Sequence, residues 1–251
     1  MSQLNELLPT RSDLLANAGL RCVLECTNTT SSGAIEHLTH GAGRRLGLLQ
    51  HSLQNVFRLL PPTAAVPLER DALNDVQVNL HAFFINLVGL FDNLAWVFAH
   101  HHGLSQFLSK PLSVGLFKSD FQKHLPTPLR ELIGSEELSN WHKTYLKNYR
   151  DALAHQIPLY VAPSVIYERD RNDYDALEAE RAKLEQEWQF DLAADVREQQ
   201  TKLEHPCFSF IHSFAPGASI GHVYVHPQLL ADAFTATSVT NAFFDSWQAQ
   251  A

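Results

Sequence analysis

The sequence predicts a mainly α-helical fold, a helical bundle with a small C-terminal antiparallel β elaboration and an inserted, charged helical arm. Three observations lead to this prediction. Apolar residues recur at helical spacing, about every three to four positions, over much of residues 1–157. Short runs rich in β-branched and aromatic residues occur only after Pro158. A stretch inside that later region combines helical spacing with dense charge.

Residues 1–33 are expected to form an N-terminal helix followed by a loop. Ser12 and Asp13 are typical of the start of a helix, and leucine and valine follow at amphipathic spacing. Residues 27–33 contain mainly Thr, Ser, Asn and Gly, which favour a loop.

Residues 34–157 are expected to form the bundle itself. One helix is predicted over 34–60 and is ended by two prolines, a second over 69–102, and a third over 135–156, before Pro158. The proline-punctuated residues 103–134 should hold only short helical pieces. Three long helices with apolar faces are enough to enclose a core.

The segment 78–99 is apolar enough to resemble a membrane span, with Asp92 as its one formal charge. However, Asn79, Asn86 and Asn93 recur every seven residues and form a polar stripe, which lipid would leave without partners. We therefore predict a central helix of the bundle and no membrane association. The stripe and Asp92 should be buried and hydrogen-bonded, with partners on the helix over 135–156.

Residues 158–251 are expected to pack on the bundle as a small sheet with an arm and a final helix. Strands are predicted around 159–161, 165–167, 207–211 and 222–225. The arm covers 168–204 and carries twelve acidic and six basic residues. The final helix is predicted over 227–247.

Composition restricts the classes of function. The chain has 251 residues, a formal net charge of −8 and 18% charged residues, which argues against a broad nucleic-acid-coating surface. Residues 110–150 nevertheless hold seven basic and four acidic side chains, so a small phosphate-facing patch is compatible with the sequence. Three cysteines do not form a disulfide framework, and the first residues lack the pattern of a signal peptide, so a cytoplasmic location is expected.

The candidate site is the group Arg150, Asp151 and His155 at the end of the third long helix. A guanidinium binds phosphate through a planar fork, and an imidazole exchanges protons near neutral pH. Asp151 and His155 are four residues apart and share a helix face, so the carboxylate is expected to orient the imidazole. Asp92, Asn93 and Asn86 are expected to support this site from the neighbouring helix.

Arg150, Asp151 and His155, preceded by the helical run 140–148, resemble the R-x4-6-H motif of the HEPN superfamily. The resemblance covers about residues 35–160. It implies a helical domain that dimerises through the helix bearing the motif and, in active members, metal-independent RNA cleavage.

Two histidine-containing groups offer metal-binding alternatives. Cys22, Cys26, His37 and His40 contain enough soft and imidazole ligands for zinc, but two buried cysteines and two surface histidines explain the same pattern. In residues 100–102 three consecutive histidines point in different directions on a helix and are expected to bond to carbonyl groups. We therefore expect neither a metal nor another cofactor at the Arg150 site.

Two functions fit the sequence. The first is a HEPN-like, toxin- or defence-type endoribonuclease that acts as a homodimer, with RNA as substrate and a protein neutraliser as partner. In it, His155 serves as general acid or base, Arg150 stabilises charge on the phosphorane and Asp151 orients them. The second is a non-catalytic HEPN-like interaction module, in which Arg150 and Asp151 form a structural ion pair and the acidic arm binds a protein.

Overall fold

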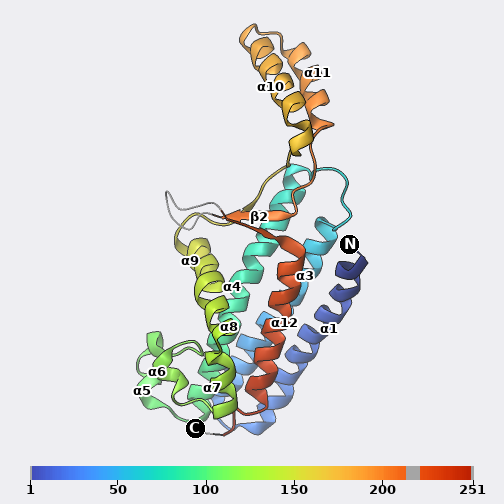
Figure 1. Cartoon of the computed structure of the whole chain (residues 1–251). Helices are drawn as coiled ribbons and strands as arrows, with labels where there is room; N and C mark the ends of the chain where they lie inside the picture. The colour runs from blue at the N-terminus through green and yellow to red at the C-terminus, as the bar shows by residue number, and fades with distance from the viewer. Residues whose placement is uncertain (1, 213–220, 250–251) are drawn as a thin grey trace.

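The computed structural model describes residues 2–212 and 221–249. It is mainly helical, with 74% helix and a small three-stranded antiparallel sheet. The mainly helical class with a small sheet is thus confirmed. Figure 1 shows long helices running side by side in the body and a helical hairpin projecting from one end.

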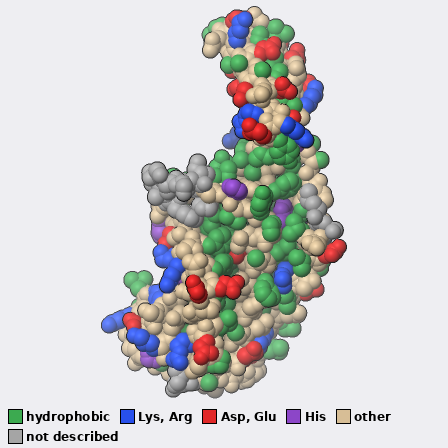
Figure 2. All heavy atoms as spheres, in the orientation of Figure 1, with side chains coloured by type: hydrophobic (Ala, Val, Ile, Leu, Met, Phe, Trp, Pro, Cys, Tyr) green, Lys and Arg blue, Asp and Glu red, His purple; other side chains and the backbone are tan. Residues whose placement is uncertain are grey.

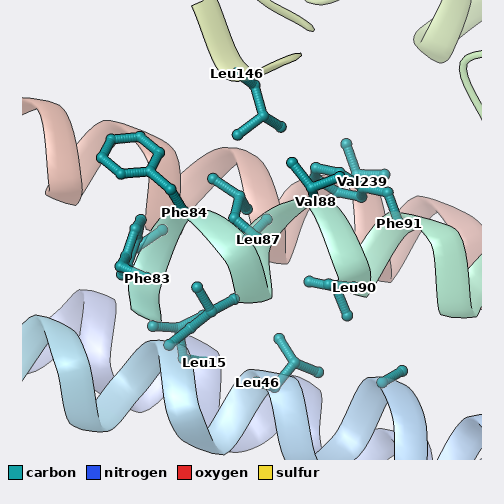
Figure 3. Close-up of a cluster of buried hydrophobic side chains, with 14 of the residues drawn as sticks. Leu15, Leu46, Phe83, Phe84, Leu87, Val88, Leu90, Phe91, Leu146 and Val239 are labelled. Atoms are coloured by element: carbon teal, nitrogen blue, oxygen red, sulfur yellow. The ribbon is translucent and has the colours of Figure 1, made fainter. Parts of the chain in front are cut away.

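The centre of the body is α4 (Arg70–His101), which matches the expected helix over 69–102. Its apolar residues are buried around most of its circumference, as expected of a helix surrounded by others. Figure 3 shows side chains from several elements meeting around it, among them Leu15, Leu46, Leu87 and Val239. The helices packed on α4 include α3 (Arg44–Leu59), α9 (Lys147–His155) and α12 (Val225–Phe244).

The N-terminal helix α1 (Ser2–Glu25) is longer than expected, and it packs on α3 and α12. A 3₁₀ turn over Cys26–Asn28 follows it. The helix expected over 34–60 is built from α2 (Ser32–Glu36), the π-helical segment η2 (His37–Gly43) and α3. The expected division into residues 1–33, 34–157 and 158–251 remains a prediction. Helices α1 and α12, which belong to the first and last of these units, both contribute to the core around α4.

Short elements connect α4 to the helix of the candidate site, as expected. They are α5 (Ser105–Leu108), η3 (Pro111–Ser113), α6 (Ser119–Gln122) and α7 (Thr127–Gly134). The third predicted helix consists of α8 (Glu136–Asn140), the π-helical η4 (Trp141–Leu146) and α9.

The sheet has the order β1-β2-β3 and lies beyond the end of α9. Its strands are β1 (Tyr160–Val161), β2 (Ser209–His212) and β3 (Gly221–Tyr224), with Phe210 opposite both Val161 and Val223. The strand predicted over 165–167 is wrong, because among the described residues only Val165 pairs there, in an isolated bridge to His205.

The arm is a hairpin of two helices that follows the 3₁₀ turn η5 (Glu168–Asp170). Its helices α10 (Arg171–Gln186) and α11 (Phe190–Thr201) pack on each other and project away from the body (Figure 1). The chain reverses at Trp188, whose positive φ of 59° ends the first helix. Figure 2 shows acidic and basic side chains mixed along the arm.

Among the described helices, α4 alone is long and apolar enough to cross a membrane. Two thirds of its most apolar stretch is buried inside the bundle, which is consistent with the core helix of a soluble protein. The asparagines Asn79, Asn86 and Asn93 are half-buried and hydrogen-bonded. Asp92, by contrast, is exposed, so the prediction that it is buried with the stripe is wrong.

Candidate functional site

The helix that carries Arg150 is fixed by its apolar face. Leu146, Tyr149 and Ala152 are buried against the core, and the Tyr149 ring stacks on Phe84 of α4 at 5.1 Å. The side chains between these positions must then point outwards, since consecutive helical residues are about 100° apart. Arg150 and Asp151 therefore lie on the accessible side of α9, where both are partly exposed.

Asp151 is bound by two cations of its own helix. Its Oδ1 lies 3.0 Å from Arg150 Nη1, and its Oδ2 accepts a hydrogen bond of 2.6 Å from Lys147 Nζ. The carboxylate thereby lies beside the Nη1 end of the guanidinium of Arg150.

His155 is exposed at the end of α9. Within residues 2–212 and 221–249, neither a hydrogen bond nor an ion pair joins it to Asp151, so the expectation that this carboxylate orients the imidazole is wrong for the single chain. On a regular helix, Arg150 and His155 are separated by about 7.5 Å along the axis and about 140° around it. One chain does not bring these two side chains to one point.

A cavity of about 260 Å³ adjoins Arg150. Four cations line it together with one carboxylate, and the apolar residues Val88, Phe91 and Leu116 form part of its wall. The charged side chains are Asp92, Lys118, Lys143, Lys147 and Arg150. This excess of cations around a partly apolar cavity suits a ligand that carries negative charge on an organic body.

Asp92 contributes to this cavity from α4. Although the residue has access to solvent, desolvation by the cavity walls raises the pKa of its carboxyl group, while Arg150, Lys118 and Arg45 act in the opposite direction. The expected link between Asp92 and Arg150 thus exists as an electrostatic one, through the shared cavity.

One wall of the cavity is a pair of stacked rings. His142 lies on Phe117 with a centroid distance of 3.8 Å and an angle of 4° between the planes. Burial, together with Lys147, Lys143 and Arg150, lowers the pKa of His142 to about 4. The imidazole is therefore neutral at physiological pH and presents an uncharged, planar surface.

Asn86 and Asn93 do not contact the helix of Arg150, contrary to the expectation for this stripe. Both accept hydrogen bonds from Arg45 of α3, at 3.1 and 2.8 Å, and they line a different cavity. Asn79 accepts from Asn55, also on α3. The stripe therefore connects α4 to α3, and of the three expected supporting residues only Asp92 reaches the Arg150 cavity.

The alternative zinc ligands do not converge. Cys22 is buried, and burial raises the pKa of its thiol to about 12, which disfavours the thiolate that zinc requires. His37 contacts Asn93, and its ring stacks beside those of Trp96 and His100, which also lie next to each other. No group of three or more potential metal ligands occurs in the described part of the chain.

The three consecutive histidines at the end of α4 have separate structural contacts. His101 Nδ1 lies 3.0 Å from Thr29 Oγ1, and His102 Nε2 lies 2.8 Å from the carbonyl oxygen of Trp247. The expected bond to a carbonyl group is thus found for His102, while His100 stacks on His37.

Four residues of the cavity were not among the predicted site residues: Lys118, His142, Lys143 and Lys147. Lys143, Lys147 and Arg150 follow one another at intervals of four and three, so a cationic stripe on one helix face was visible in the sequence. No local pattern signals Lys118, since it reaches the cavity from a loop whose path depends on the tertiary fold.

Comparisons with known proteins add no relative: no family model, no curated protein and no solved structure matches this chain.

Proposed function

We propose that this protein is a HEPN-like endoribonuclease that binds an RNA phosphate in the Arg150 cavity and acts as a homodimer. The observation that carries the proposal is the convergence of four cations on a cavity walled by stacked rings. Cations neutralise phosphates, and planar rings accept unstacked bases, which are the usual contacts of single-stranded RNA.

In the proposed reaction the RNA 2′-oxygen attacks the adjacent phosphorus, and the bond from phosphorus to the 5′-oxygen breaks. A base accepts the proton of the 2′-hydroxyl, an acid donates a proton to the departing 5′-oxygen, and a 2′,3′-cyclic phosphate remains. In this proposal Arg150 stabilises the negative charge on the phosphorane with guanidinium N–H groups other than the one beside Asp151.

His155 is the proposed proton-transfer group, and it lies outside the cavity of its own chain. The partner's His155 would have to approach the cavity for the reaction to proceed. This geometric requirement, together with the resemblance to the HEPN motif, is the reason for proposing a dimer. Light scattering that shows only a 28.2 kDa particle at high micromolar concentration would contradict it.

The test is cleavage of single-stranded RNA in the presence of a chelator by the wild type, Arg150→Gln and His155→Ala, with His51→Ala as control. His51 is exposed on α3, outside the cavity, so its loss should leave cleavage unchanged. We expect each site variant to lose at least about 100-fold in rate, because His155→Ala removes a proton-transfer group and Arg150→Gln removes a group that stabilises the transition-state charge. Cleavage that survives His155→Ala would remove this residue from the mechanism.

A second function, a non-catalytic interaction module, is favoured by one specific observation. Asp151 binds Arg150 and Lys147 instead of His155, as expected of a structural ion pair. The arm would then bind the partner, because its tip exposes Trp188, Phe190 and Leu192. RNA that remains equally intact with the wild type and with His155→Ala, in the presence of a chelator, would favour this function over the nuclease.

A further inference from the structure

A second cavity, of about 460 Å³, lies between η2, α3 and α4. It shares no lining residue with the Arg150 cavity, and most of its lining residues are polar or charged. Its charged and polar side chains come from Glu36, His37, His40, Arg44, Arg45, Asn86 and Asn93. The function proposed for the Arg150 site makes no use of this second cavity.

Arg45 is the half-buried cation of this cavity. Its Nε donates to Asn93 Oδ1 at 2.8 Å, and its Nη1 donates to Asn86 Oδ1 at 3.1 Å. Both acceptors are neutral amides, and no carboxylate of the described residues lies within ion-pair distance of this guanidinium, although Arg45 acts electrostatically on Asp92. The two amides therefore orient the guanidinium of Arg45 but carry no charge that would neutralise it.

Two glycines make room for this arrangement. A β-carbon at Gly89 would lie 2.3 Å from Arg45 Cζ, and one at Gly41 would lie 2.6 Å from Asn93 Cγ. The guanidinium and the amide therefore rest directly against helix backbone. Their position depends on the packing of α4 and η2, which orients these donors before any ligand binds.

His37 extends the network on the side of η2. Asn93, whose oxygen is used by Arg45, has its Nδ2 3.0 Å from His37 Nδ1. An amide nitrogen donates, so Nδ1 is the acceptor and a neutral His37 carries its proton on Nε2. The ring is held by stacking on Trp96 and His100, at 5.6 and 5.5 Å. The π-helical turn that supplies His37 and His40 is a form often found at functional sites.

We propose that this cavity binds the phosphate group of a small phosphorylated molecule on Arg45. Arg44 and the imidazoles of His37 and His40 supply further donors to the oxyanion. A tetrahedral phosphate uses several donors from different directions, whereas a carboxylate is satisfied by one planar fork. The cavity exceeds the volume of one phosphate, and Glu36 on its lining disfavours a second phosphate group, so the rest of the ligand is a polar body of low charge.

The experiment is isothermal titration calorimetry at constant ionic strength and pH 7.5, with inorganic phosphate, adenosine 5′-monophosphate and acetate as probes. The proteins are the wild type, Arg45→Gln, Arg44→Gln, His40→Gln and Arg150→Gln, with Arg58→Gln as matched control. Arg58 is an exposed arginine on the same helix and lies outside both cavities. Circular dichroism establishes that each variant is folded.

We expect saturable binding of both phosphate probes to the wild type, weakened about tenfold or more in Arg45→Gln because charge-assisted hydrogen bonds are lost. Arg44→Gln should weaken it several-fold and Arg58→Gln should leave it unchanged, while Arg150→Gln removes only binding that belongs to the other cavity. Tighter binding of the monophosphate than of inorganic phosphate identifies a phosphorylated molecule as the ligand, and the reverse order identifies free phosphate.

Several results would overturn the proposal. Binding that is retained in Arg45→Gln and lost in Arg150→Gln would place the phosphate in the other cavity. Acetate binding as tightly as phosphate would contradict recognition of a tetrahedral anion. If Arg45→Gln does not fold, the test passes to the exposed residues Arg44 and His40. An unchanged phosphate affinity in both Arg44→Gln and His40→Gln would then contradict the proposed site. The result is independent of the ribonuclease proposal, which requires Arg150.

Discussion

The hydroxyl of Tyr145 donates a hydrogen bond of 2.7 Å to Asp232, and this contact joins the helix of Arg150 to α12. Trp141 Nε1 and Gln228 Nε2 donate to the other oxygen of the same carboxylate. Asp232 is fully buried and has no cation among these partners. Ionising a buried carboxylate that has only neutral donors costs free energy, so the stability of the fold should depend on pH.

Asp232→Asn should therefore flatten the pH dependence of stability. Burial raises the pKa of the Asp232 carboxyl group from 3.8 to about 6, so the folded protein favours the protonated form. The contribution of this group to the free energy of unfolding is largest below pH 4 and is lost as the pH rises towards 6, by up to roughly 3 kcal/mol. Urea denaturation of both proteins between pH 4 and 7 measures it. Asp13→Asn, at an exposed site, should keep the wild-type profile, and an unchanged profile in Asp232→Asn would contradict the prediction.

Lys143→Gln should weaken RNA binding without altering preference among sequences. Lys143 is exposed and lines the Arg150 cavity, so its proposed role is the neutralisation of one phosphate. Removing one such contact should reduce the slope of log affinity against log salt concentration by about 0.7 to 1. Fluorescence anisotropy over a salt series gives this slope. Lys183→Gln on the arm is the matched control, and an equal change there would show a diffuse effect of net charge.

Alanine at two helical glycines should have opposite effects on stability. At Gly47 a β-carbon meets nothing within 4 Å, so Gly47→Ala should stabilise the protein by about 0.5–1 kcal/mol through helix propensity. At Gly89 it would displace Arg45 and break its two amide hydrogen bonds, which should destabilise the protein by about 1–3 kcal/mol. Thermal denaturation compares the two, and stabilisation by Gly89→Ala would mean that Arg45 moves freely.

Replacing residues 171–203 by a short Gly-Ser linker should leave the bundle folded. The helices α10 and α11 pack mainly on each other, and the bridge between Val165 and His205 keeps the two ends of the arm close together. We expect a single cooperative transition within a few degrees of the wild-type midpoint, measured by circular dichroism. Loss of cooperativity in the shortened protein would show that the arm supports the body.

The long elements were predictable because each carries a complete local signal. The helix α4 has apolar residues around its circumference and ends two residues before Gly103, so its bounds follow from the sequence to within one residue. The arm was expected as one helical segment, and the reversal at Trp188 was missed because a positive φ at tryptophan has no sequence signature.

The site was predictable only in part, for a different reason. Arg150 and Asp92 were expected together, and a shared cavity brings them together. The partner of Asn86 and Asn93 was assigned to the wrong helix, since periodicity identifies a polar stripe but not the neighbour that it faces. Arg45 belongs to an ordinary amphipathic helix, and only the tertiary contact distinguishes it from Arg44 beside it.

The packing of α12 against α1 and α4 has a consequence for synthesis of the chain. Leu15 and Ala18 of α1 lie in the same core as Ala233 and Phe243 of α12, more than 200 positions later. Contacts of such sequence separation form slowly, because a long loop must close before they contribute. On the ribosome, the apolar groove that α12 fills stays open until nearly all the preceding residues have emerged. The nascent chain therefore exposes apolar surface of the kind that chaperones bind.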